Sequence, residues 1–193
     1  MLKIKFLIAV MFLSFQLSSL AWGSGFAADM GFTVSGGTVS DKLGTIPGRT
    51  MVNGSAFLET GWHIKFVSPL IFGEYRYSGQ TTDETTVENQ NMGGSGYLFG
   101  VGLRLDFRKY FLSGYFDFSG AYKLAKTTPS GDDSVYSSPR GFHVWLGKKL
   151  TANTKWFLSF SEVSYSQSSI FGELVENKLT QLSYGVGILI PFH

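Results

Sequence analysis

Hydrophobic and polar residues alternate with a period of two along most of the chain from Met30 onward, which is the pattern of β-strands with two different faces. The segment 97–107 shows this pattern most clearly. One of its faces carries only bulky apolar side chains, namely Tyr97, Phe99, Val101, Leu103, Leu105 and Phe107. The other face carries glycines and charges, including Gly100, Gly102, Arg104 and Asp106. The chain is therefore predicted to be all-β.

Eight segments of this kind follow one another, at about residues 30–35, 56–66, 71–78, 97–107, 112–124, 142–147, 156–165 and 182–192. Even-numbered residues form the apolar face in most of them, and odd-numbered residues do so at 71–77 and 97–107. In the segment 112–124 this places Tyr122 on the apolar face and Lys123 on the polar face. In the segment 156–165 the apolar positions shift to Val163 and Tyr165, which predicts a β-bulge near residues 161–162.

The connections between these segments alternate strictly between long and short. Long polar stretches are expected at 37–54, 79–95, 126–139 and 167–178, and tight turns at 67–69, 108–109 and 151–154. Acidic residues gather in the long stretches, whereas the turn regions hold Arg108, Lys109, Lys148 and Lys155. Outer-membrane barrels are connected in this way, with long loops outside the cell and short turns in the periplasm. Both chain ends are then expected on the periplasmic side.

The content of the two faces favours a membrane barrel over a soluble one. An eight-stranded interior holds small and medium side chains, and it does not hold all the rings of the apolar face. Those rings therefore face outward, and Tyr and Trp near strand ends suit the aromatic girdles at the two membrane interfaces. The predicted fold is an eight-stranded antiparallel up-and-down transmembrane β-barrel. The predicted girdle consists of Trp62, Tyr75, Tyr77, Tyr97, Tyr122, Trp156 and Tyr184.

The first residues have the layout of an export signal. Lys3 and Lys5 precede an apolar run from Phe6 to Leu20, and Ala21-Trp22-Gly23 is a cleavage candidate. We expect a signal peptide at 1–23 and the barrel at 24–193; a retained anchor helix is the alternative. Removing residues 1–23 takes two lysines from a chain with 16 basic and 14 acidic side chains, so the remainder is formally neutral apart from histidine. No basic patch indicates nucleic-acid binding.

These features resemble the family of small eight-stranded outer-membrane barrels that includes the OmpA transmembrane domain, OmpX and the opacity-type surface proteins. The resemblance covers the mature chain at the level of architecture. The C-terminal segment 184–192 is similar to the family's assembly signal, although Pro191 and the final His193 depart from it. The resemblance implies insertion by the barrel-insertion machinery, location in the bacterial outer membrane, and contact with outer-membrane lipid and lipopolysaccharide. The partner of the extracellular loops is unknown.

Ten residues of the polar faces carry charge or can acquire it: Glu59, His63, Lys65, Glu74, Arg76, Arg104, Asp106, Asp117, Lys123 and His143. Unpaired charges are costly in a narrow interior, so these groups are expected to pair with one another. The resemblance implies the same, because such barrels carry an internal salt-bridge network. A path for protons or small ions is the alternative.

Enzymatic motifs are weak. Some eight-stranded outer-membrane barrels are lipid A deacylases that use a His-x-Ser pair, but this chain has Trp145 where that serine would follow His143. On the next predicted strand, Ser159, Ser161 and Glu162 could approach His143. They were chosen only because that strand is adjacent, and no motif supports them. The chain has no cysteine, and no phosphate loop or metal-ligand spacing is found, so no cofactor is expected. We expect a non-enzymatic barrel with a structural or surface-interaction role; the alternatives are a minimal pore, a lipid A-modifying enzyme, and an adhesin or phage receptor.

Overall fold

The structure is a computed structural model that describes residues 25–41, 49–64, 66–81, 92–126, 134–151, 154–170, 173–175 and 178–192. The signal peptide expected at 1–23 lies outside these residues. The described strands are β1 (Phe26–Asp41), β2 (Arg49–Trp62), β3 (Val67–Thr81), β4 (Met92–Phe107), β5 (Tyr110–Lys126), β6 (Ser134–Thr151), β7 (Thr154–Ile170), β8 (Glu173–Val175) and β9 (Leu179–Phe192). No helix in this part of the chain is long and apolar enough to cross a membrane.

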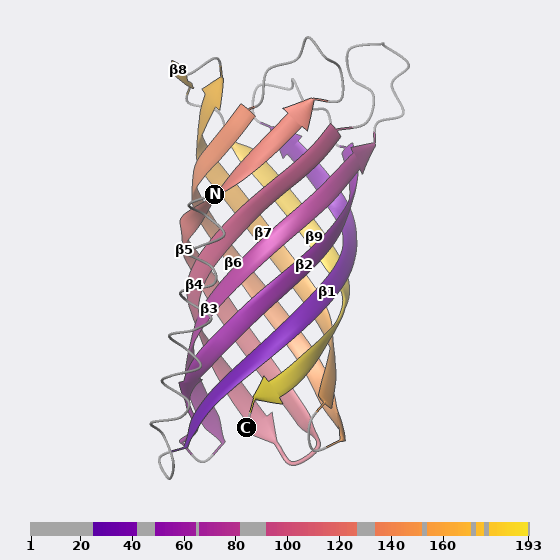
Figure 1. Cartoon of the computed structure of the whole chain (residues 1–193), viewed down its shortest axis with the longest axis vertical. Coiled ribbons are helices and arrows are strands. Elements are labelled where there is room, and N and C mark those ends of the chain that lie inside the picture. Colours follow the sequence, from indigo (N-terminus) through magenta and orange to yellow (C-terminus); the bar gives the residue numbers. More distant parts are fainter. Residues whose placement is uncertain are drawn as a thin grey trace.

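Eight long strands close into a barrel. Strands β1 to β7 each pair antiparallel with their neighbour in the chain, and β9 pairs with both β1 and β7. The short β8 pairs only with the end of β7. The predicted eight-stranded antiparallel up-and-down barrel is confirmed. Figure 1 shows the strands inclined to the long axis, with the short turns and the C-terminal end of β9 at one end, which we call the turn end. We call the opposite end the loop end.

The strands extend further than the sequence pattern predicts. Strand β1 runs to Asp41 and β2 begins at Arg49, so much of the loop expected at 37–54 is strand. The turn expected at 67–69 is also wrong, because Val67 already begins β3 and two backbone hydrogen bonds between Ile64 and Val67 (2.8 and 3.0 Å) close the turn. Ser68-Pro69 is typical of turns, but proline is tolerated in the first residues of a strand.

A β-bulge in β5 reverses the two faces of its second half. Gly100 pairs with Asp117 and Phe99 with Ser119, so Phe118 is an extra residue on β5. Beyond this point the side chain of Tyr122 is fully buried inside the barrel, and that of Lys123 is exposed outside. The predictions that Tyr122 belongs to the outer girdle and Lys123 to the interior were therefore wrong. The cause is the bulge, since one extra residue exchanges the faces of every residue that follows it.

The bulge expected in β7 is absent. Strand β7 pairs with β9 without interruption from Lys155 to Tyr165. Val163 and Tyr165 consequently keep the parity of Ser161 and point into the barrel, where both are buried. The apolar residues that suggested a slip in register are instead part of the interior packing.

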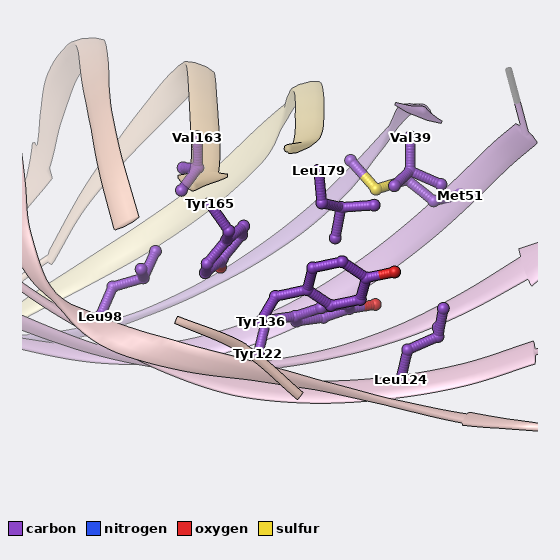
Figure 2. Close-up of a cluster of buried hydrophobic side chains, with 9 residues drawn as sticks. All are labelled: Val39, Met51, Leu98, Tyr122, Leu124, Tyr136, Val163, Tyr165 and Leu179. Carbon is purple, nitrogen blue, oxygen red and sulfur yellow. The ribbon is translucent and has the colours of Figure 1, made fainter. Parts of the chain in front are cut away.

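Two groups of buried hydrophobic side chains fill the barrel at different heights. The group nearer the loop end, drawn in Figure 2, contains Val39, Met51, Leu98, Tyr122, Leu124, Tyr136, Val163, Tyr165 and Leu179. Within it the rings of Tyr122 and Tyr165 lie 5.8 Å apart. The group nearer the turn end, which we call the aromatic layer, contains Phe57, Leu70, Phe72, Phe111, Tyr115, Trp145, Phe157 and Leu189. The interior is packed rather than open.

Two strand glycines differ in the space around them and allow a matched test of this packing. A Cβ at Gly31 would overlap the ring of Phe57 and lie 2.6 Å from the carbonyl oxygen of Ile188, whereas a Cβ at Gly54 would meet nothing within 4 Å. We expect Gly31→Ala to lower the free energy of unfolding by about 1–3 kcal/mol, the usual cost of overpacking. Gly54→Ala is expected to leave it unchanged or slightly raised. Urea midpoints of the two variants check this, and equal midpoints would contradict the packing at Phe57.

Candidate functional site

The guanidinium of Arg104 is the centre of a charge network near the turn end. Asp29 of β1 and Glu59 of β2 are directly paired in the sheet, so their carboxylates lie side by side. Arg104 of β4 is fully buried and its Nη1 contacts both, at 2.5 Å from Asp29 Oδ2 and in a shorter contact with Glu59 Oε1. Its Nε donates to Asp106 Oδ2 at 3.1 Å. One cation therefore joins three acids from three strands.

Two lysines and a tyrosine complete this network. Lys155 Nζ lies 3.3 Å from Asp29 Oδ2, and Lys149 Nζ lies 3.4 Å from Asp106 Oδ1. The hydroxyl of Tyr115 donates to Glu59 Oε2. Three acids thus face three cations, which compensates the cost of burying the charges. Sequence analysis missed Asp29, Lys149 and Lys155. The first strand was predicted to begin at Met30, although β1 begins at Phe26, and both lysines lie next to a predicted turn. Extending the alternation of β1 back by one residue finds Asp29.

A second polar layer lies between the two hydrophobic groups. Arg76 Nε and Nη2 donate to the two carboxylate oxygens of Glu74 at 3.2 and 3.1 Å, and Arg76 Nη1 donates to Gln181 Oε1 at 3.4 Å. His143 Nε2 and Asp117 Oδ2 are 2.7 Å apart. A cavity of about 10 Å³ lies beside Glu74, Arg76 and His143, which is room for about one water molecule. The acid–base pairs expected from the sequence are brought together here.

The aromatic layer separates these two polar layers. The ring of Trp145 stacks on Phe157 at 4.6 Å and lies 4.5 Å from both Phe57 and Tyr115. Phe72 lies 5.5 Å from the same indole. Rings from five strands therefore meet across the barrel. This close packing of rings lies between the Arg104 network and the layer of Glu74, Arg76 and His143.

His63 lies at the turn end between β2 and β3, with its side chain 35% exposed. Its Nδ1 is 2.7 Å from Ser68 Oγ, and its Nε2 is 3.4 Å from Arg104 Nη2. Burial and the nearby Arg104 guanidinium lower the pKa of His63 below its usual value of 6.5. Of the ten predicted interior residues, His63 is thus at the edge of the network, Lys123 is outside the barrel, and Lys65 lies outside the described residues.

The lowered pKa of His63 has a consequence for stability. Between the folded pKa and about 6.5 the unfolded chain binds more protons at this residue than the folded chain, so stability decreases as the pH falls through that window. We expect His63→Gln to remove this part of the pH dependence. The difference between the unfolding free energies of the parent and the variant, measured from pH 7.5 to 5, checks it. A difference that does not change with pH would contradict the shift.

Six of the seven predicted girdle residues lie on the outer surface of the barrel, and one lies inside it. Trp62, Tyr75, Tyr77, Tyr97 and Tyr184 are exposed on the outer surface, with between 36% and 62% of each residue accessible. Trp156 also points outward but is partly covered. Tyr122 is the exception, for the reason given above.

The residues considered for lipid hydrolysis are arranged unfavourably for that reaction. His143 and Ser161 are cross-strand partners, but both point into the barrel and are 3% and 5% exposed. Ser161 Oγ lies 2.7 Å from Ser183 Oγ, and Glu162 belongs to the outer face. An acyl chain in a surrounding bilayer would not reach His143 through the closed wall. In the described part of the chain, no three His, Cys, Asp or Glu residues are placed to hold a metal ion.

Comparisons with known proteins support the fold and no closer relationship. No family model and no curated protein matches the sequence. Among solved structures, Ail, the attachment invasion locus protein of Yersinia pestis, has a TM-score of 0.52 alone (10% identity) and 0.53 in complex with the heparin analogue sucrose octasulfate (12% identity). Both comparisons cover 86% of this chain and 99% of Ail.

Two further matches have lower TM-scores. Neisserial surface protein A has a TM-score of 0.49 at 13% identity, over 88% of this chain and 98% of its own. The outer-membrane protease OmpT of Escherichia coli has a TM-score of 0.40 at 10% identity, over 88% of this chain and 94% of its own. At these identities the likeness to Ail concerns the fold alone.

Proposed function

We propose that this chain is an integral outer-membrane barrel of a bacterium, with a structural or surface-interaction role and a closed interior. The observation that carries the proposal is the polarity of the barrel wall. Large apolar side chains are exposed on the outer face of all eight long strands, for example Val34, Ile71, Phe116, Leu146 and Val186. Charged side chains such as Glu59, Arg104 and Asp117 are buried inside. In water such a surface would aggregate, whereas in a bilayer it is solvated.

The closed interior supports a role other than solute transport. The two hydrophobic groups and the two polar layers occupy the interior along the barrel, and eight strands leave space only for side chains. A pore for ions or small solutes therefore requires rearrangement of Trp145 and its neighbours. The structural likeness to Ail, whose name describes attachment, supports a surface-interaction role but does not identify a ligand.

The membrane barrel is tested by fractionation and by gel migration. We expect the protein in the outer-membrane fraction, with migration on SDS gels that differs between unheated and boiled samples. Soluble recovery from the periplasm, with no effect of heating, would overturn the proposal. A Val186→Asp variant is the comparison, because an acid in the middle of the apolar outer face opposes insertion. We expect less of this variant than of the parent protein in the outer-membrane fraction.

Two further measurements separate the proposed role from its rivals. Purified protein in planar bilayers is expected to show no sustained conductance, and steady ion currents would instead support the pore. Lipid A isolated with and without expression of the protein is expected to have the same acyl pattern. Loss of an acyl chain on expression would instead support the enzyme.

A further inference from the structure

Three exposed cations lie together at the turn end, and we call them the basic rim: Arg108, Lys109 and Lys148. Arg108 and Lys109 form the tight turn between β4 and β5, and Lys148 is near the end of β6. A backbone hydrogen bond of 2.8 Å from Lys149 N to Lys109 O joins this turn to β6. Tyr110 of β5 is the cross-strand partner of Lys148. The three cations therefore occupy one side of the barrel, on adjacent strands.

The charge of the basic rim is not neutralised by the acids described at the same end. Asp29, Glu59 and Asp106 point into the barrel, where Arg104, Lys155 and Lys149 compensate them. Asp29 and Glu59 are almost fully buried, and the Asp106 side chain is 10% exposed. Among the described residues of the turn end, the exposed charges therefore have one sign. This end presents a positive surface although the chain without its first 23 residues is formally neutral apart from histidine.

The basic rim is set among apolar and aromatic side chains rather than in open solvent. Along β6, Lys148 lies between Leu146 and Leu150, which are 55% and 59% exposed. Across the sheet it lies between Tyr110 and Trp156. On the neighbouring hairpin, Phe107 and Tyr110 flank Arg108 and Lys109 and are 52% and 54% exposed. Lysine and arginine in such surroundings bury their aliphatic stems and place the charge at the level of lipid headgroups.

We propose that the basic rim binds the phosphodiester headgroup of an anionic glycerophospholipid in the leaflet that contacts the turn end. The inference rests on the membrane location proposed above. Three cations held near one another at headgroup depth match a phosphate that carries a full negative charge, and the flanking rings pack on its glycerol and upper acyl chains. A zwitterionic phospholipid offers the same phosphate with a neutralising amine, so it is bound more weakly.

The test measures lipid preference at the surface of the folded protein. The protein is inserted into phosphatidylcholine vesicles that contain either spin-labelled phosphatidylglycerol or spin-labelled phosphatidylcholine, and the immobilised fraction of each label gives a relative association constant. We expect a preference of about fivefold for phosphatidylglycerol over phosphatidylcholine at low salt, because the three cations share one headgroup. Salt at 1 M is expected to reduce it, because the Debye length falls to about 3 Å.

Three variants make the test specific to the basic rim. R108Q/K109Q/K148Q is expected to abolish the preference, and the charge-conserving R108K/K109R/K148R is expected to keep it. The matched control K123Q/R140Q/K178Q removes three exposed cations from elsewhere on the chain and is expected to keep the preference. A preference that survives R108Q/K109Q/K148Q, or that the control removes equally, would overturn the inference. Heat-dependent gel migration of each sample first shows that the barrel has inserted; failure of the parent protein to insert would instead overturn the proposed function.

Discussion

Replacing Trp145 by alanine is expected to lower the free energy of unfolding by about 3–5 kcal/mol, the range found for removing a large aromatic side chain from a packed interior. The indole lies within 4.6 Å of the rings of Phe57, Tyr115 and Phe157, measured between ring centroids, and is 2% exposed. None of these neighbours can move far, because each is fixed to a strand of a closed barrel. Most of the space left by the indole therefore remains as a cavity.

Leu146→Ala is the matched control for this change. Leu146 is the next residue of β6, points outward and is 55% exposed, so its loss leaves no enclosed cavity. Its effect on stability is expected to be less than half that of Trp145→Ala. Urea unfolding in lipid vesicles, followed by the migration shift on gels, measures both. Similar losses for the two variants would show that the aromatic layer is not a rigid core.

Replacing Arg104 by methionine is expected to cost about 3–5 kcal/mol of stability, as is usual when one partner of a buried ion pair is removed. Arg104 is fully buried and contacts Asp29, Glu59 and Asp106. Without it, Asp29 and Glu59 remain side by side in the barrel, with the Lys155 ammonium beside Asp29 and the Tyr115 hydroxyl beside Glu59. Repulsion between these two carboxylates and the loss of their hydrogen bonds both act against the folded state.

Two further variants distinguish this network from an ordinary surface ion pair. Lys149→Gln breaks a contact whose lysine side chain is 37% exposed, and it is expected to cost no more than about 1 kcal/mol. R104M/E59Q removes one of the two paired carboxylate charges and is expected to recover part of the stability lost in Arg104→Met. The same urea assay applies. A double variant no more stable than Arg104→Met would show that repulsion with Glu59 is not the cause of the loss.

Much of the fold was predictable from local pattern because both faces of each strand have a clear chemical identity. Strand β4 alternates bulky apolar residues with glycine and charge, and its assignment was correct to its end at Phe107. The turn at Arg108–Lys109 was also found, since the alternation stops there; the next strand was predicted from Leu112, and β5 begins two residues earlier, at Tyr110. The strands were predicted too short at the loop end, because polar residues such as Thr38, Ser40 and Thr50 look like loop residues while they are still paired in the sheet.

The candidate site was predictable in its residue types and less so in its pairings. Alternation placed Glu59, Glu74, Arg76, Arg104, Asp117 and His143 inside, but the partners of Arg104 depend on the register between β1 and β2 and on strands far apart in sequence. Asp29 is 75 residues from Arg104. The pair Glu74–Arg76 was within reach, because residues two apart on one strand share a face.

The sequence by itself determined the class of fold and the strand count, because these follow from a period of two repeated eight times. It also determined the polarity of the wall, because the two faces differ in content: one is bulky and aromatic, and the other carries glycine and charge. Only the tertiary structure decided the position of the bulge in β5, which turns Tyr122 inward and Lys123 outward. It also decided that Val163 and Tyr165 lie inside, and that the rings around Trp145 close the barrel. The physical reason is that an apolar side chain is stable on either side of this wall, in lipid or in a packed interior. Alternation shows which residues share a face, but the fit of rings and charges from different strands decides what that face contacts.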